Sequence, residues 1–229
     1  MLASYRIVLS SADLIAANDI LNVQQLPSFT PFSTPNSPIL YGVRHCSLSP
    51  HVYHACFNLL SMVEQRRCCH IKNATRRLLF VLGRVLLRRA ISDVFDVDMM
   101  SVDIIQPCER SKPFSSVCSF NISYSGDLLI VVLGISGDVG VDIERISSGL
   151  DINEIANYFL PLVYQDYIRS FPAHAQCLAF YESWTYIESR CKLTGHGLTG
   201  APLPLPPDSS TFLINFADLP YVGHLACDL

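Results

Sequence analysis

The chain has 229 residues, of which 50% are hydrophobic and 16% are charged, and its formal net charge is −4. This composition excludes disorder over most of the chain and is compatible with one large domain or two small ones. A net-negative protein has no general reason to bind nucleic acid. Any anionic ligand must therefore be held by a local group of basic residues.

The positive mean hydropathy does not predict a membrane span, because the longest apolar run, 128–133, is far too short to cross a bilayer. The first residues lack the basic start and apolar centre of a signal peptide. The nine cysteines are an odd number without metal-ligand spacing, which favours reduced thiols. We therefore expect a cytoplasmic protein without a membrane span.

In chain order, a proline-rich loop at 27–38 precedes a helical pattern over 59–90. Four strands are predicted next, over 102–105, 120–123, 128–133 and 139–143, with a turn at Ser125-Gly126. Helices follow over 152–170, interrupted at Pro161, and over 177–193, ended by Gly195. Strands over 212–216 and 222–227 close the chain. This order predicts an α+β protein of two similar lobes.

Two carboxylates stand close together in the strand Gly140-Val141-Asp142-Ile143-Glu144. Because side chains alternate along a strand, Asp142 and Glu144 are expected to project from one face and to be exposed. Mg²⁺ would relieve their repulsion, since it prefers oxygen ligands and shares them with phosphates. The alternative is a solvated strand end beside Arg145.

A second group lies in the predicted helix, where Glu188 and Lys192 are four residues apart and share one face. They form either an ordinary surface ion pair or a functional pair. In the functional interpretation, Glu188 completes the metal site and Lys192 meets phosphate.

Together these motifs resemble the surfactin-type 4′-phosphopantetheinyl transferases. That family has a G-[VI]-D-[IVL]-E strand, matched at 140–144, and a W-[ST]-x-K-E-[AS]-x-x-K helix followed by G-x-G-L, matched at 184–198 except at Ile187. Further similarity lies in the F-N-I-S-Y-S-G segment at 120–126, in Lys112-Pro113, and in the G-R-x-x-x-R pattern of Gly83, Arg84 and Arg88. The closing segment 221–226 is also similar. Residues 1–58 match the family poorly.

The resemblance implies two tandem, pseudo-twofold-related α/β lobes, 1–137 and 138–229, with the active site in the cleft between them. It implies an enzyme that transfers 4′-phosphopantetheine from coenzyme A to a serine of an apo acyl or peptidyl carrier protein, releasing adenosine 3′,5′-bisphosphate. Peptide, polyketide, siderophore or fatty-acid assembly are the processes it would serve. A monomer is expected.

The resemblance also assigns roles to individual residues. Asp142, Glu144 and Glu188 would bind Mg²⁺, with Asp142, Glu188 and Lys192 as catalytic residues. The nucleotide and phosphates of coenzyme A would be bound by Arg84, Arg76, Lys112, Ser123, Tyr124 and Lys192. A solvated basic face is the alternative for the arginines.

Three departures from the family pattern affect the mechanism. Ile187 replaces a lysine and Tyr124 replaces a histidine, so two cations near phosphate are missing. The usual glutamate base is also absent, which leaves Tyr164, Gln165, Asp166 or a metal-bound water to accept the serine proton. The substitution Ile187→Lys is expected to leave activity unchanged or to raise it. The alternative function is a non-catalytic relative that binds coenzyme A or a carrier protein without transfer.

Overall fold

The computed structural model describes residues 6–22, 24–30, 34–45, 48–106, 112–195 and 209–228. The chain divides into two compact units, one formed by Ala12–Ser136 and the other by Met1–Ser11 with Gly137–Leu229. Each unit has helices and its own four-stranded sheet, so the predicted α+β class is confirmed. The N-terminal residues lie with the second unit, which the predicted boundary at residue 137 did not foresee. The predicted pseudo-twofold relation and the predicted cleft stay predictions.

The unit Ala12–Ser136 contains a sheet with the order β2-β3-β5-β4. Its strands are β2 (Ile15–Ala16), β3 (Ile39–Arg44), β4 (Ser119–Ser125) and β5 (Leu128–Gly134). Only the β2–β3 pair is parallel within this sheet. Its α-helices are α1 (Pro50–Asn58), α2 (Met62–His70) and α3 (Ala74–Phe95), and the short 3₁₀ helices of the segment are η1 (Ser11–Asp13), η2 (Ala17–Asp19) and η3 (Met99–Ser101).

The helical pattern predicted over 59–90 is confirmed by α2 and α3, but its continuity across 71–73 is wrong because the two helices are separate. The Ser61 hydroxyl accepts a hydrogen bond from the Glu64 amide, and Glu64 bonds back to the Ser61 backbone, so a capping box starts α2. Asn73 caps the start of α3 in a similar way. The strand predicted over 102–105 was also wrong, since only an isolated bridge joins Ile105 to Phe114.

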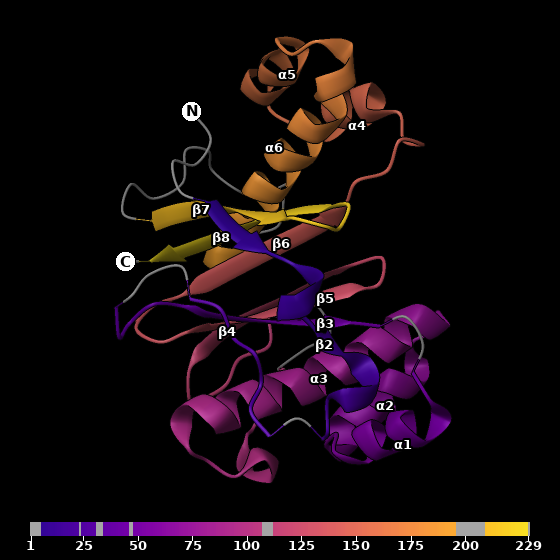
Figure 1. The fold of residues 1–229 in the computed structure, drawn as a ribbon, viewed down its shortest axis with the longest axis vertical. Coiled ribbons are helices and arrows are strands. Elements are labelled where there is room, and N and C mark those ends of the chain that lie inside the picture. The colour runs from indigo at the N-terminus through magenta and orange to yellow at the C-terminus, as the bar shows by residue number, and fades with distance from the viewer. Residues whose placement is uncertain are drawn as a thin grey trace. The chain divides into compact units, whose positions relative to one another are not determined.

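Helix α3 supplies much of the core of this unit. Figure 1 shows it lying along the sheet that contains β3 and β5. Its buried apolar side chains, among them Leu82, Val85 and Leu86, pack with Val43 of β3 and Val131 of β5. Two of its arginines, Arg84 and Arg88, are also buried, and both contact Glu64 of α2.

The second unit contains a sheet with the order β1-β7-β8-β6. Its strands are β1 (Arg6–Leu9), β6 (Val139–Arg145), β7 (Ser209–Phe216) and β8 (Tyr221–Asp228), and its helices are α4 (Ile152–Phe159), α5 (Leu162–Arg169) and α6 (Ala173–Thr194). The predicted break at Pro161 separates α4 from α5. Gly195, with a φ of 75°, ends α6 in the left-handed conformation that glycine accommodates without strain.

Helix α6 lies across β6 and β8, with α4 and α5 packed against it (Figure 1). A cluster of apolar side chains fills the space under these helices, including Leu160, Ile168, Phe180 and Ile187. Although α3 and α6 each have 22 residues, no helix in the described part of the chain is both long and apolar enough to cross a membrane.

The two units repeat one connection. In the first, β3 leads through helices to β4 and then β5, and β5 lies between β3 and β4 in the sheet. In the second, β6 leads through helices to β7 and then β8, and β8 lies between β6 and β7. Each sheet also has a fourth strand that pairs in parallel, and its position differs: β2 pairs with β3 in the first unit, whereas β1 pairs with β7 in the second. The similarity of the lobes therefore lies in their topology.

Candidate functional site

Strand β6 brings Asp142 under helix α6. Gly140, two residues earlier on the same face, lets the helix approach the strand, because a Cβ at this position would overlap the backbone of Ser189 and Leu193. Asp142 is consequently buried, with 5% of its surface exposed, and Glu144 at the strand end is half-buried. The expectation that Asp142 is an exposed carboxylate was wrong, because α6 covers this face.

Lys192, in the last turns of α6, meets Asp142 directly. Its Nζ lies 2.6 Å from Asp142 Oδ1 and 3.2 Å from the carbonyl oxygen of Val141. About 30% of the lysine side chain is exposed, against 7% of the aspartate side chain. The short distance and the burial of Asp142 make this a charge-assisted contact that fixes the end of α6 on β6.

Glu188 lies one turn before Lys192 and is also half-buried. Burial raises the pKa of Glu188, and the negative charges of Asp142 and Glu144 raise it further, while Lys192 opposes them. Glu188 is therefore close enough to Asp142 and Glu144 to be affected by their negative charges. The structure thus brings together all four residues that the sequence motifs selected in this unit.

Carboxylate oxygens are the ligands that a hard divalent cation such as Mg²⁺ prefers, so the chemistry of Asp142, Glu144 and Glu188 fits the predicted metal. Within the described ranges, no group of three His, Cys, Asp or Glu side chains is placed so that it could hold a metal ion as it stands. Instead, the Lys192 ammonium supplies positive charge to Asp142.

His224 of β8 was not selected as a site residue from the sequence, although it lies directly opposite Asp142 in the sheet. It is 1% exposed, and its Nδ1 lies 2.8 Å from the Thr185 hydroxyl of α6. Burial lowers the pKa of His224 to about 3, so the ring is neutral at physiological pH. This contact between helix and strand holds α6 over the sheet beside the carboxylates.

A second candidate site is a cavity of about 320 Å³ in the unit Ala12–Ser136. Arg84, Lys112 and Tyr124, which were selected from the sequence, all line it. Arg76 is exposed near the start of α3 and is not among the lining residues. Ser123 is buried next to Tyr124 in β4 and does not line the cavity either.

Sequence reasoning missed three other residues of this cavity, namely Arg67, Phe80 and Gln106. The guanidinium carbons of Arg67 and Arg84 lie 5.6 and 5.1 Å from the centre of the Phe80 ring. Both arginines also donate hydrogen bonds to the side-chain oxygen of Gln106. The i, i+4 spacing of Phe80 and Arg84 was a usable signal, whereas the contribution of Arg67 depends on how α2 packs on α3.

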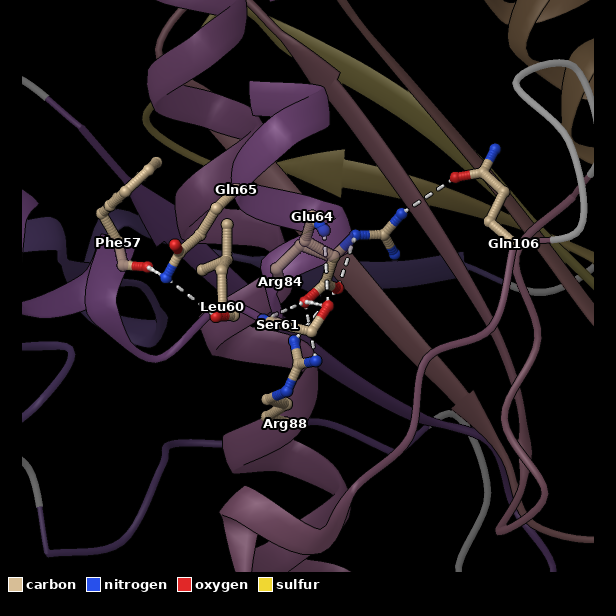
Figure 2. A network of polar contacts seen from close by, with 8 residues as sticks. All are labelled: Phe57, Leu60, Ser61, Glu64, Gln65, Arg84, Arg88 and Gln106. Carbon is tan, nitrogen blue, oxygen red and sulfur yellow. Dashed lines mark hydrogen bonds and ion pairs between the residues drawn. The ribbon is translucent and has the colours of Figure 1, made fainter. Parts of the chain in front are cut away.

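Behind Arg84 lies the buried carboxylate of Glu64, shown in Figure 2. Arg88 binds both oxygens of Glu64, at 3.2 and 2.8 Å, and the Nε of Arg84 lies 3.4 Å from the nearer oxygen. Burial lowers the pKa of Arg84 to about 10, and Glu64 opposes this shift. Arg84 therefore remains charged at neutral pH.

The structure also places the residues that depart from the family pattern. Ile187 is 3% exposed and packs in the apolar cluster under the helices of its unit. Burial raises the pKa of Tyr164 to about 12, and Gln165 is buried, with its amide donating to the Leu160 carbonyl at 2.8 Å. Asp166 is exposed and pairs with Arg169 of the same helix. Tyr164 and Gln165 therefore have structural roles: Tyr164 packs inside its unit, and Gln165 holds the Leu160 carbonyl.

The segment that contains the carboxylate group is similar to known proteins. Residues 138–225 match the model of the 4′-phosphopantetheinyl transferase superfamily, a segment that contains Asp142, Glu144, Glu188 and Lys192. This part of the chain is therefore similar to members of that superfamily.

Individual relatives are similar over a larger part of the chain. The 4′-phosphopantetheinyl transferase psf-1 of Bacillus pumilus is 32% identical over 122 residues, which are 52% of this chain and 51% of the relative. HetI of Nostoc sp. is 28% identical over 146 residues, 61% of each chain. AcpT of Salmonella typhi is 32% identical over 123 residues, 52% of this chain and 60% of the relative. The chain is thus similar over about half to three-fifths of the length of each of these transferases.

Proposed function

We propose that this protein is an active, surfactin-type 4′-phosphopantetheinyl transferase that uses coenzyme A and Mg²⁺. The observation that carries the proposal is the group formed by Asp142, Glu144, Glu188 and Lys192 within the segment that matches the superfamily. The names of the matched relatives state the same activity for those proteins.

In the proposed reaction, the hydroxyl oxygen of a carrier-protein serine forms a new bond to the phosphorus that bears pantetheine. The pyrophosphate P–O bond breaks, and adenosine 3′,5′-bisphosphate leaves with the bridging oxygen. The serine proton must pass to a base. Among Tyr164, Gln165 and Asp166, only Asp166 is a carboxylate.

Asp142, Glu144 and Glu188 would hold the metal. When bound, Mg²⁺ would neutralise charge on the phosphate oxygens and relieve the repulsion among the three carboxylates. Lys192, whose Nζ lies 2.6 Å from Asp142 Oδ1, would contact phosphate.

The cavity lined by Arg84, Lys112 and Tyr124 would bind the nucleotide part of coenzyme A. Arg67, Arg84 and Lys112 give it three cationic side chains in a protein whose net charge is negative. A planar guanidinium suits a phosphate because it can donate two parallel hydrogen bonds. Arg76, which does not line the cavity, is replaced in this proposal by Arg67.

The test is incubation of the purified protein with apo carrier protein, coenzyme A and Mg²⁺, followed by mass spectrometry of the carrier. The expected result is addition of phosphopantetheine to its serine. Asp142→Asn is expected to lower kcat/KM by at least about a hundredfold, because it removes a charged ligand from the proposed metal site. Lack of modification under conditions in which an authentic transferase works would contradict the proposal.

A matched control is Glu182→Gln, because Glu182 is another half-buried carboxylate on α6. Its raised pKa comes from burial with an opposing effect of Arg6, and Asp142 and Glu144 are not among its causes. It is expected to retain most of the activity. Equal losses in Asp142→Asn and Glu182→Gln would indicate a general effect on α6.

The alternative is a relative that binds coenzyme A without transferring phosphopantetheine. The structural roles of Tyr164 and Gln165 favour this alternative, because neither side chain can act as a base at neutral pH. Titration of coenzyme A with and without Mg²⁺ separates the two functions: metal-linked binding with turnover supports the enzyme, and binding without turnover supports the alternative.

A further inference from the structure

Three buried side chains on α2 and α3 form an arginine–glutamate–arginine group. The exposed fractions of the Arg84, Glu64 and Arg88 side chains are 7%, 7% and 5%. All three come from the unit Ala12–Ser136, and Figure 2 shows the carboxylate of Glu64 between the two guanidinium groups. One negative charge is thus buried with two positive charges, so one positive charge is in excess.

The two arginines contact Glu64 differently. Arg88 makes two hydrogen bonds to the carboxylate, and Ser61 adds two more through its amide at 2.9 Å and its hydroxyl at 3.0 Å. Arg84 reaches Glu64 only through Nε, at 3.4 Å. The carboxylate is therefore satisfied mainly by Arg88 and by the capping box of α2.

The two arginines also differ in what else they face. Arg84 lines the cavity that contains Lys112 and Tyr124, whereas Arg88 is not among its lining residues. The Nη1 of Arg84 is buried and has no hydrogen-bond partner in the described part of the chain. A buried donor without a partner is costly, and an anion in the cavity would satisfy it.

We propose that Arg88 keeps the positive charge of Arg84 available to a phosphate monoester in the cavity by neutralising Glu64. Arg88 is then a positioning residue, because it acts through Glu64 and Arg84 without touching the ligand. This inference rests on the proposed function, and the ligand group is the 3′-phosphate of the nucleotide. In the absence of Arg88, Glu64 would draw Arg84 into a close ion pair and cancel its charge.

The test measures binding of adenosine 3′,5′-bisphosphate by calorimetry, with adenosine 5′-monophosphate as the probe that lacks the 3′-phosphate. Arg88→Met is expected to weaken binding of the bisphosphate about tenfold or more and to change binding of the monophosphate little. The double variant Glu64→Gln with Arg88→Met is expected to bind the bisphosphate within about threefold of the wild type, because both partners of the buried pair are then neutral.

Arg89→Met is the matched control. Arg89 neighbours Arg88 on α3, lies 4.0 Å from Asp93, and does not line the cavity. The substitution Arg89→Met removes one positive charge, as Arg88→Met does, but leaves the contacts of Glu64 in place. The affinity of this variant for the bisphosphate should therefore stay close to that of the wild type.

Each of the following results would overturn the inference. A double variant that binds as weakly as Arg88→Met, or more weakly, would show that Arg88 has only a packing role. Equal weakening in Arg88→Met and Arg89→Met would show a general effect of charge. If the wild type itself binds both nucleotides equally, the nucleotide assignment of the cavity fails; if it prefers the bisphosphate and Arg88→Met keeps that preference, only this inference fails.

Discussion

Ile187 occupies a motif position but has a structural role, because it is part of the apolar core of its unit. In the family pattern, this position carries a lysine that is expected at phosphate. Here the side chain is 3% exposed and packs with Leu160, Ile168 and Phe180. The surroundings of residue 187 are thus apolar and suit an isoleucine, whereas a lysine there would have to bury its charge.

Ile187→Lys is therefore expected to destabilise the protein by about 3 kcal/mol or more, because it replaces a buried apolar side chain with an ammonium group. The sequence alone predicts unchanged or higher activity for this variant, because the motif does not show that Ile187 is buried. Urea unfolding of the variant is the measurement. Ile187→Met, which keeps volume and polarity, should cost less than about 1.5 kcal/mol. A lysine variant as stable as the wild type would show that the new side chain reaches solvent.

At the scale of elements, the carboxylate site depends on the contact between α6 and β6. Gly140 allows this contact, and the pair of Lys192 and Asp142 holds α6 on β6. On the other side of Glu188, the bond between Thr185 and His224 holds α6 on the neighbouring strand β8. The helix and strand thus set the spacing of the charged groups.

Gly140→Ala is expected to lower the free energy of unfolding by at least about 2 kcal/mol, because its methyl group would overlap the backbone of α6, which cannot rotate away as a side chain could. Thermal or urea unfolding checks this. Gly149→Ala is the control, since the nearest atom to an added Cβ there, Ser147 Oγ, is 3.9 Å away. Its effect should stay within about 0.5 kcal/mol. Similar stabilities of the two variants would mean that α6 can shift without cost.

At the scale of the whole molecule, a strand near the N-terminus belongs to the sheet of the second unit. Strand β1 pairs in parallel with β7, so residues near the N-terminus complete a sheet whose other strands lie after residue 137. Ile7 and Leu9 are buried, while Val8 between them is exposed. The segment 1–58, for which the family resemblance gave no role, therefore contributes β1 to the second unit and β2 and β3 to the first.

Ile7→Ala is expected to destabilise the second unit by about 2–4 kcal/mol, because it deletes a fully buried branched side chain. Hydrogen exchange at the amides of β7 should increase selectively. Val8→Ala, on the exposed face of the same strand, should change stability by no more than about 0.5 kcal/mol. Unchanged exchange at β7 in Ile7→Ala would contradict the role assigned to β1.

Much of the fold could be predicted from local patterns. The strands β4, β5, β6, β7 and β8, the break at Pro161 and the end of α6 at Gly195 were all predicted, because alternation, proline and glycine act over a few residues. The division of 59–90 into separate helices was missed, although Ser61 and Asn73 are recognisable N-caps. Strands β1 and β3 were missed because their pairing partners lie far away in the chain.

The sequence by itself determined the α+β class and the group of Asp142, Glu144, Glu188 and Lys192, because each motif lies within one strand or one helix whose geometry is regular. Only the tertiary structure showed that Asp142 is buried against Lys192, that Ile187 is in the core, and that Arg67 rather than Arg76 lines the cavity with Arg84. These features depend on how one element covers another. Burial and long-range packing are properties of the folded chain, and the local sequence does not specify them.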